Sequence, residues 1–169
     1  AGTGELEAAD FARFEALVEQ RCTGIPLQHV TGEAWFRGIR LAVGPGVFIP
    51  RPETELVAQA AIDQALKLKS ALVVELCAGS GAISAACLAE APDAQVVAVE
   101  REPQAFEWLR RNLADTSAEV VLAQMADAVP QLNGQVDVVV ANPPYIPTQQ
   151  ELELPAEVRD HDPPAALFA

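Results

Sequence analysis

The residues best suited to chemistry are Asn142-Pro143-Pro144-Tyr145, which directly follow an apolar run of residues. Two consecutive prolines remove two backbone donors and fix φ twice. The side-chain oxygen of Asn142 and the carbonyl oxygen of Pro143 are therefore adjacent acceptors with no competing N–H. Two such acceptors can hold a planar NH₂ group by its hydrogens and orient its nitrogen for reaction. Tyr145 can pack on a flat group beside it, and a purely structural stiff turn is the alternative interpretation.

A second candidate site is the segment Glu-Leu-Cys-Ala-Gly-Ser-Gly at residues 75–81, between a predicted strand and a predicted helix. Gly79 and Gly81 let a ligand approach the backbone closely, and the following helix start offers free N–H groups. The third glycine of the dinucleotide fingerprint is missing. The carboxylate of Glu75 would repel a pyrophosphate but can hold an ammonium group. This favours S-adenosylmethionine over a dinucleotide, and an ordinary tight turn is the alternative.

Two further strand ends carry polar or polarisable side chains. Glu100 ends the next predicted strand, where an acid can accept hydrogen bonds from ribose hydroxyls. Gln124 and Met125 follow the third predicted strand and are expected near an adenine, since a thioether packs well on an aromatic face. A surface position for Glu100 and core packing for Met125 remain open alternatives.

The elements that must position these residues alternate between strand and helix. A helix is expected at 9–20, a hairpin around the Arg37-Gly38 turn at 34–43, and a helix from about 54 to 69. The later strands are apolar runs without period-2 alternation, which indicates an α/β fold with a doubly wound, mostly parallel sheet covered on both faces. Ligands of such sheets bind at the carboxyl ends of the strands, where all the motifs above fall. The expected strands are 71–76, 95–100, 118–123 and 136–141, and the helices between them are 82–91 and 102–113.

The composition limits the possible functions. The net charge of −13 disfavours binding to a phosphate backbone, so no direct nucleic-acid binding is expected. The three cysteines form no CxxC pair and the two histidines are far apart, so neither a metal site nor a disulfide framework is indicated. No apolar run has the roughly 20 residues of a membrane span, and no signal peptide is recognisable. A cytoplasmic protein that binds no membrane is expected.

Taken together, these motifs carry a resemblance to a known family. CAGSG at 77–81, Glu100 and NPPY at 142–145 resemble, in order and spacing, the Rossmann-like class I methyltransferases that act on planar NH₂ nitrogens. The stretches GIPLQHVTGEAWFRG at 24–38 and GVFIPRPETE at 46–55 are similar to segments of HemK/PrmC-type protein-(glutamine-N5) methyltransferases. The resemblance implies S-adenosyl-L-methionine as cofactor, S-adenosyl-L-homocysteine as product, and a protein partner. The partner that the resemblance implies is a class I peptide-chain release factor, which would be methylated on the glutamine of its Gly-Gly-Gln motif.

The resemblance also implies roles for individual residues. Those implied to hold the reacting amide are Asn142, Pro143, Pro144 and Tyr145. Those implied to bind the cofactor are Glu75, Cys77, Ala78, Gly79, Ser80, Gly81, Glu100, Arg101, Gln124, Met125 and Asn142. Those implied to line the substrate pocket are Phe48, Pro50, Arg51, Pro52, Glu53 and Thr54, together with Asn142, Pro143, Pro144 and Tyr145.

The chain departs from the family pattern at several points. The family usually has Asp-Leu-Gly-Thr-Gly where this chain has Glu75-Leu76-Cys77-Ala78-Gly79, and Asp where Gln124 stands. Residues 1–23 are expected to be a remnant of a helical N-terminal domain, 24–52 a linker with the hairpin, and 53–169 the methyltransferase domain without its C-terminal strands. The alternatives are a nucleic-acid enzyme that methylates an adenine-N6 or guanine-N2 amine and a catalytically impaired binding module.

Overall fold

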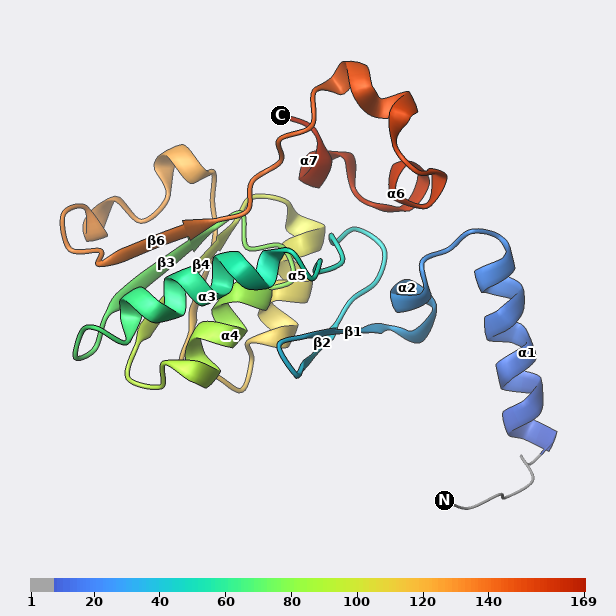
Figure 1. The fold of residues 1–169 in the computed structure, drawn as a ribbon, viewed down its shortest axis with the longest axis horizontal. Coiled ribbons are helices and arrows are strands. Elements are labelled where there is room, and N and C mark those ends of the chain that lie inside the picture. Colours follow the sequence, from blue (N-terminus) through green and yellow to red (C-terminus); the bar gives the residue numbers. More distant parts are fainter. Residues whose placement is uncertain (1–7) are drawn as a thin grey trace.

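The computed structural model describes residues 8–169, and its centre is a four-stranded, all-parallel sheet (Figure 1). The strand order is β5-β4-β3-β6. The parallel direction of the strands is the one that their apolar runs predicted. The chain therefore reverses its direction of winding at β3, which has β4 on one side and β6 on the other. The strands are β3 (Leu72–Leu76), β4 (Gln95–Glu100), β5 (Glu119–Leu122) and β6 (Val138–Ala141).

The register places the functional motifs side by side. Leu76, the last residue of β3, pairs with Val99 of β4 and with Ala141 of β6. The loops that follow β3 and β6 therefore leave the sheet at the same level, at the reversal point where open α/β sheets bind ligands. This explains how two motifs more than sixty residues apart come to face one pocket.

Three α-helices pack on one face of the sheet, and 3₁₀ turns cover the other. The apolar core on the helical face includes Ile62 of α3, Cys87 of α4 and Leu109 of α5, all fully buried. Val97 and Val99 face the opposite side, where the segment between β5 and β6 packs on them. The covering elements are α3 (Thr54–Ala65), α4 (Ala82–Glu90) and α5 (Pro103–Asn112), with η1 (Met125–Asp127) and η2 (Pro130–Leu132) opposite.

The predicted hairpin is present as β1 (Glu33–Phe36) and β2 (Ile39–Ala42), which pair antiparallel. Its two-residue turn has positive φ at both positions, 48° at Arg37 and 75° at Gly38. This is the backbone pattern that matches the twist of a hairpin best. Gly38 adopts it without strain, whereas Arg37 needs other contacts to hold it there.

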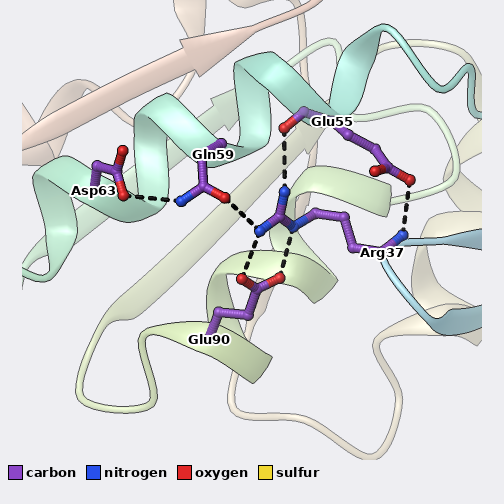
Figure 2. Close-up of polar contacts among 5 residues, drawn as sticks. All are labelled: Arg37, Glu55, Gln59, Asp63 and Glu90. Atoms are coloured by element: carbon purple, nitrogen blue, oxygen red, sulfur yellow. Dashed lines mark hydrogen bonds and ion pairs between the residues drawn. The ribbon is translucent and has the colours of Figure 1, made fainter.

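Those contacts attach the hairpin to two helices (Figure 2). The Arg37 guanidinium donates to both carboxylate oxygens of Glu90 at 2.6 Å and to the side-chain oxygen of Gln59 at 2.7 Å. The backbone N–H of Arg37 donates to the carboxylate of Glu55 at 3.1 Å. One side chain therefore joins the turn to α3 and α4, and bidentate pairing of this kind is the strong form of an ion pair.

The N-terminal helix α1 (Ala8–Cys22) lies apart from the sheet (Figure 1) and is followed by α2 (Leu27–Thr31). The prediction of a helix at 9–20 is confirmed. Phe11, Phe14 and Val18, which the helical period places on one face, are exposed. No helix among the described residues is long and apolar enough to cross a membrane.

The C-terminal segment folds back over the carboxyl ends of the strands (Figure 1). Ile146 pairs with Phe168, and the Ile146 N–H donates to the carbonyl of Leu167 at 2.9 Å. Sequence patterns gave no confident element here, because the helices are short and begin after prolines. They are η3 (Thr148–Glu153), α6 (Ala156–His161) and α7 (Pro164–Leu167).

Candidate functional site

A pocket of about 700 Å³ opens at the carboxyl ends of the strands and collects the predicted residues. Its size is typical of small-molecule sites. Two predicted residues are not part of its lining: Pro52 is exposed outside it, and Gly81 lies behind the loop at the start of α4. The predicted residues that line it are Phe48, Pro50, Arg51, Glu53, Thr54, Glu75, Cys77, Ala78, Gly79, Ser80, Glu100, Arg101, Gln124, Met125, Asn142, Pro143, Pro144 and Tyr145.

Part of the lining was not predicted from the sequence. The C-terminal segment contributes small and apolar side chains, α3 and α5 add one residue each, and α4 adds Ala82 and Ile83. The stretch VRDHDPPAALF resembles the family, but its charged residues follow no motif spacing, so nothing in the sequence marks it as part of a site. The unpredicted lining residues include Val57, Ile83, Ala105, Ile146, Val158, Pro163, Ala165, Ala166 and Leu167.

The loop at 77–81 has a tightly specified backbone. Cys77, Gly79 and Gly81 all have positive φ, of 56°, 56° and 81°. A Cβ added at Gly81 would lie 2.7 Å from the Leu109 side chain, so only glycine fits there. Cys77 is the one non-glycine residue among the three, and a positive φ is less favourable for it than for glycine. The loop that presents its backbone to the pocket is therefore locally strained at Cys77.

Glu100 holds this loop from the neighbouring strand. One carboxylate oxygen, Oε2, accepts the Gly79 N–H at 2.8 Å. The other, Oε1, accepts the N–H groups of Arg101 and Glu102 at 2.8 and 2.9 Å. Because a carboxylate oxygen can accept two hydrogen bonds, Oε2 retains capacity for one more donor, such as a ribose hydroxyl. The interpretation of Glu100 as a plain surface acid is excluded, since it is buried.

Glu75 is buried between the loop and the start of α4. Its Oε2 accepts the Ser84 N–H at 2.8 Å and also a short hydrogen bond from the Ser84 hydroxyl. Burial raises the pKa of Glu75 to about 7, the Ser84 hydrogen bonds oppose this, and the charge of Glu100 adds to it. Its Oε1 makes no hydrogen bond among the described residues, and an ammonium group placed there would favour the ionised form.

The two most specific motifs meet in the pocket. The side-chain nitrogen Nδ2 of Asn142 donates to the Thr54 hydroxyl at 3.2 Å, although the residues are 88 positions apart. With Nδ2 engaged, the oxygen Oδ1 of Asn142 makes no hydrogen bond among the described residues, and Pro143 lines the same pocket. Tyr145 is 75% exposed at the mouth of the pocket, where a flat group can stack on it. The arrangement is an acceptor pair for a planar NH₂ group.

Arg51 ties the pocket wall to the C-terminal segment. Its guanidinium pairs with Asp162 at 2.5 Å and lies 4.8 Å from the centre of the Phe48 ring. The Asp162 side chain is 1% exposed, and its pKa is raised by burial, against the opposing charge of Arg51. A buried carboxylate of this kind depends on its partner.

The polar groups of the pocket fit S-adenosylmethionine. Glu100 offers an acceptor for a ribose hydroxyl, Glu75 a carboxylate for an ammonium group, and Met125 is exposed within the pocket rather than packed in the core. Gly79 leaves space for a ligand, since nothing lies within 4 Å of a Cβ built on it. Among residues 8–169, no group of three or more acidic, histidine or cysteine side chains could hold a metal ion.

Comparisons with known proteins agree with this geometry. Residues 40–157 match the methyltransferase small domain family, and residues 2–32 match the PrmC N-terminal domain. The chain is 51% identical over 159 residues to a release factor glutamine methyltransferase of Mycolicibacterium smegmatis, covering 93% of this chain and 56% of that protein. It is 41% identical over 162 residues to a 4-amino-L-phenylalanine/4-methylamino-L-phenylalanine methyltransferase of Streptomyces pristinaespiralis, covering 93% of this chain and 55% of that one.

A solved structure supports the fold. The T. thermophilus 16S rRNA N2 G1207 methyltransferase RsmC superimposes with a TM-score of 0.56 at 23% identity, over 69% of this chain and 33% of that one. The chain spans little more than half the length of the two curated relatives above. The family match covers most of the chain and coincides with the sheet, the loop and the pocket. The chain therefore belongs to the methyltransferase small domain family, and its predicted resemblance to HemK/PrmC-type enzymes is confirmed.

Proposed function

We propose that the protein methylates N5 of the glutamine side chain in the Gly-Gly-Gln motif of class I peptide-chain release factors. The observation that carries this proposal is the contact between Thr54 of the FIPRPETE stretch and Asn142 of NPPY at the wall of the pocket. It leaves Asn142 Oδ1 and the Pro143 carbonyl as paired acceptors for an amide NH₂. The release factor glutamine methyltransferase relative supports the same substrate.

The residues of the pocket would act mainly by positioning. S-adenosyl-L-methionine, when bound, supplies an electrophilic methyl group on sulfur and leaves as S-adenosyl-L-homocysteine. An amide nitrogen is a weak nucleophile, because its lone pair is delocalised. Asn142 and Pro143 would hold both of its hydrogens, fix the approach of the nitrogen, and stabilise the positive charge that develops on N–H. Tyr145 and Phe48 would flank the planar group.

The proton lost from the nitrogen needs an acceptor. No histidine or lysine lines the described pocket. The pocket mouth near Tyr145 is open to solvent, so water takes the proton after methyl transfer in this proposal. Glu75, Glu100 and the 77–81 loop would bind the cofactor, as would Arg101, Gln124 and Met125.

The remaining expectations fit this proposal. The division into 1–23, 24–52 and 53–169 stays a prediction, and residues 1–7 lie outside the described part of the chain. A cytoplasmic location, where release factors act, stays a prediction. A net charge of −13 favours a basic protein partner over nucleic acid.

One observation favours a second candidate, a small aromatic amine as methyl acceptor. The S. pristinaespiralis relative is named for a substrate that carries an NH₂ group on a ring. Such a group also has two hydrogens near one plane, and the open, aromatic-flanked pocket could admit it. The two candidates differ in substrate size and not in the acceptor pair.

The test is a methyl-transfer assay with the protein at its complete natural length and labelled S-adenosylmethionine. Release factor, 4-amino-L-phenylalanine, and DNA and RNA oligonucleotides serve as parallel acceptors. Label on the release-factor glutamine, lost in Asn142→Ala, is the expected result. Label on the free amine alone would establish the second candidate, and label on a nucleic acid alone would establish a nucleic-acid enzyme. Cofactor binding without transfer to any acceptor would indicate an impaired binding module.

A further inference from the structure

A side chain that no sequence pattern marked lies between the hairpin and the glycine-rich loop. Asn112 is the last residue of α5, and all the polar atoms of its amide are engaged. Its oxygen Oδ1 accepts the Ala42 N–H at 2.8 Å, and its nitrogen Nδ2 donates to the Ala42 carbonyl at 2.9 Å. The same nitrogen donates to the Ser80 carbonyl at 2.9 Å. One amide therefore joins strand β2 to the loop at 77–81.

The Ser80 carbonyl is a sensitive point of that loop. Three positions of positive φ make the loop a conformation that persists only when its surroundings specify it. Glu100 holds the Gly79 N–H, and the Val99 carbonyl accepts the Ala78 N–H at 3.0 Å. Both contacts come from β4 and engage donors of the loop. Asn112 engages an acceptor of the loop, and Ser80 is buried.

We propose that Asn112 is a positioning residue that fixes the cofactor loop and couples it to the β1–β2 hairpin. The proposal rests on the cofactor of the proposed function and not on the identity of the methyl acceptor. Because coupling between two sites is reciprocal, cofactor binding should also stabilise the hairpin. The hairpin connects the N-terminal helices to the sheet, so cofactor binding would also affect the stability of the chain where these helices join it.

The competing explanation is that Asn112 only keeps the hairpin attached. Arg37 provides the matched control, because it attaches the same hairpin from its turn (Figure 2). Its partners are on α3 and α4, and it is not part of the pocket lining. Loss of Arg37 should loosen the hairpin without releasing the Ser80 carbonyl.

The experiment measures the affinity for S-adenosyl-L-homocysteine by calorimetry in the wild type, Asn112→Ala, Asn112→Asp and Arg37→Ala. We expect both alanine variants to lower Tm, and only Asn112→Ala to weaken binding, by about 3- to 10-fold for one lost hydrogen bond. Asn112→Asp keeps an acceptor for the Ala42 N–H but loses both donors, so its affinity should also fall. Should the alanine variant fail to fold, the aspartate variant carries the comparison.

A second readout is hydrogen exchange at the backbone amides of β2. Bound S-adenosyl-L-homocysteine should slow their exchange in the wild type and in Arg37→Ala, and should not do so in Asn112→Asp. Wild-type affinity in both Asn112 variants, or an equal loss of affinity in Arg37→Ala, overturns the inference. If the wild type methylates release factor normally while the Asn112 variants bind normally, the positioning role alone is wrong. If the wild type binds no S-adenosyl-L-homocysteine, both proposals are wrong.

Discussion

The Asn142 side-chain nitrogen donates to the Thr54 hydroxyl at 3.2 Å, which joins the loop after β6 to the first turn of α3. This contact decides what Asn142 can offer a substrate. If the Asn142 side-chain amide were rotated by 180°, it would present its own NH₂ to the NH₂ of the methyl acceptor, and two donors cannot pair. In the structure the Thr54 hydroxyl accepts from Nδ2, and the amide is in the orientation that leaves Oδ1 for the substrate.

The first prediction concerns this contact. Thr54→Val keeps the shape of the side chain and removes the hydroxyl, so we expect kcat for methyl transfer to fall about 5- to 10-fold, as for one neutral hydrogen bond. Thr54→Ser keeps the hydroxyl and should retain most of the activity. The affinity for S-adenosyl-L-homocysteine, measured by calorimetry, should stay unchanged in both variants. Equal activity of Val and Ser variants would show that the hydroxyl does not orient Asn142.

The second prediction concerns the strained position in the glycine-rich loop. Cys77 has a φ of 56°, so Cys77→Gly should raise the free energy of unfolding by roughly 0.5–1 kcal/mol, after the entropy cost of glycine is subtracted. Gly79→Ala is the reverse test, because Gly79 has the same φ and open space around it. It should lower the free energy by about 1 kcal/mol. Urea unfolding measures both, and a less stable Cys77→Gly would contradict the assignment of strain.

The third prediction concerns Glu75. Its pKa is about 7 in the folded protein, above the ordinary 4.5, so the folded state binds a proton more tightly than the unfolded state. The proton-linked stability is fully present below about pH 4.5 and is lost as the pH rises through about 7. Glu75→Gln cannot titrate, so the stability of the variant relative to the wild type should increase from pH 5 to pH 8. We expect this increase to be on the order of 2–4 kcal/mol.

The control for Glu75 is Glu119→Gln, which changes an exposed carboxylate on β5. Its effect on stability should be small, within a few tenths of a kcal/mol, as for most exposed surface substitutions. Urea unfolding at both pH values provides the comparison. A pH-independent effect of Glu75→Gln would mean that Glu75 is ionised over the whole range.

The sequence predicted the parallel sheet and most of the pocket, because these depend on local patterns. Apolar strand runs, glycines and the Pro143-Pro144 pair each specify their own conformation. In the sheet, β3 pairs with β6, and this pairing brings the loops after the two strands together. What could not be predicted depends on contacts between distant segments: the Asn112 amide, the Arg37–Glu90 ion pair and the cover formed by residues 146–168.

The C-terminal cover shows why. Its helices are too short to give a hydrophobic period, and one of its contacts with the rest of the chain joins Arg51 to Asp162, which are 111 positions apart. An arginine in one loop and an aspartate in another suggest nothing until the fold brings them together. The resemblance of VRDHDPPAALF to the family indicated that this stretch belongs to the enzyme, but it did not indicate which other residues the stretch contacts.

The last prediction concerns the attachment of this cover. Arg51→Met removes the partner of a carboxylate that is 1% exposed, so we expect a loss of about 2–4 kcal/mol of stability and faster proteolysis between residues 146 and 168. Burial already raises the pKa of Asp162, and protonation removes the unpaired charge, so the loss should be smaller at pH 5 than at pH 8. The double variant Arg51→Met/Asp162→Asn should recover most of the stability, because neither charge remains. If the double variant is as unstable as Arg51→Met alone, the packing of Arg51 on Phe48 attaches the cover and the ion pair does not.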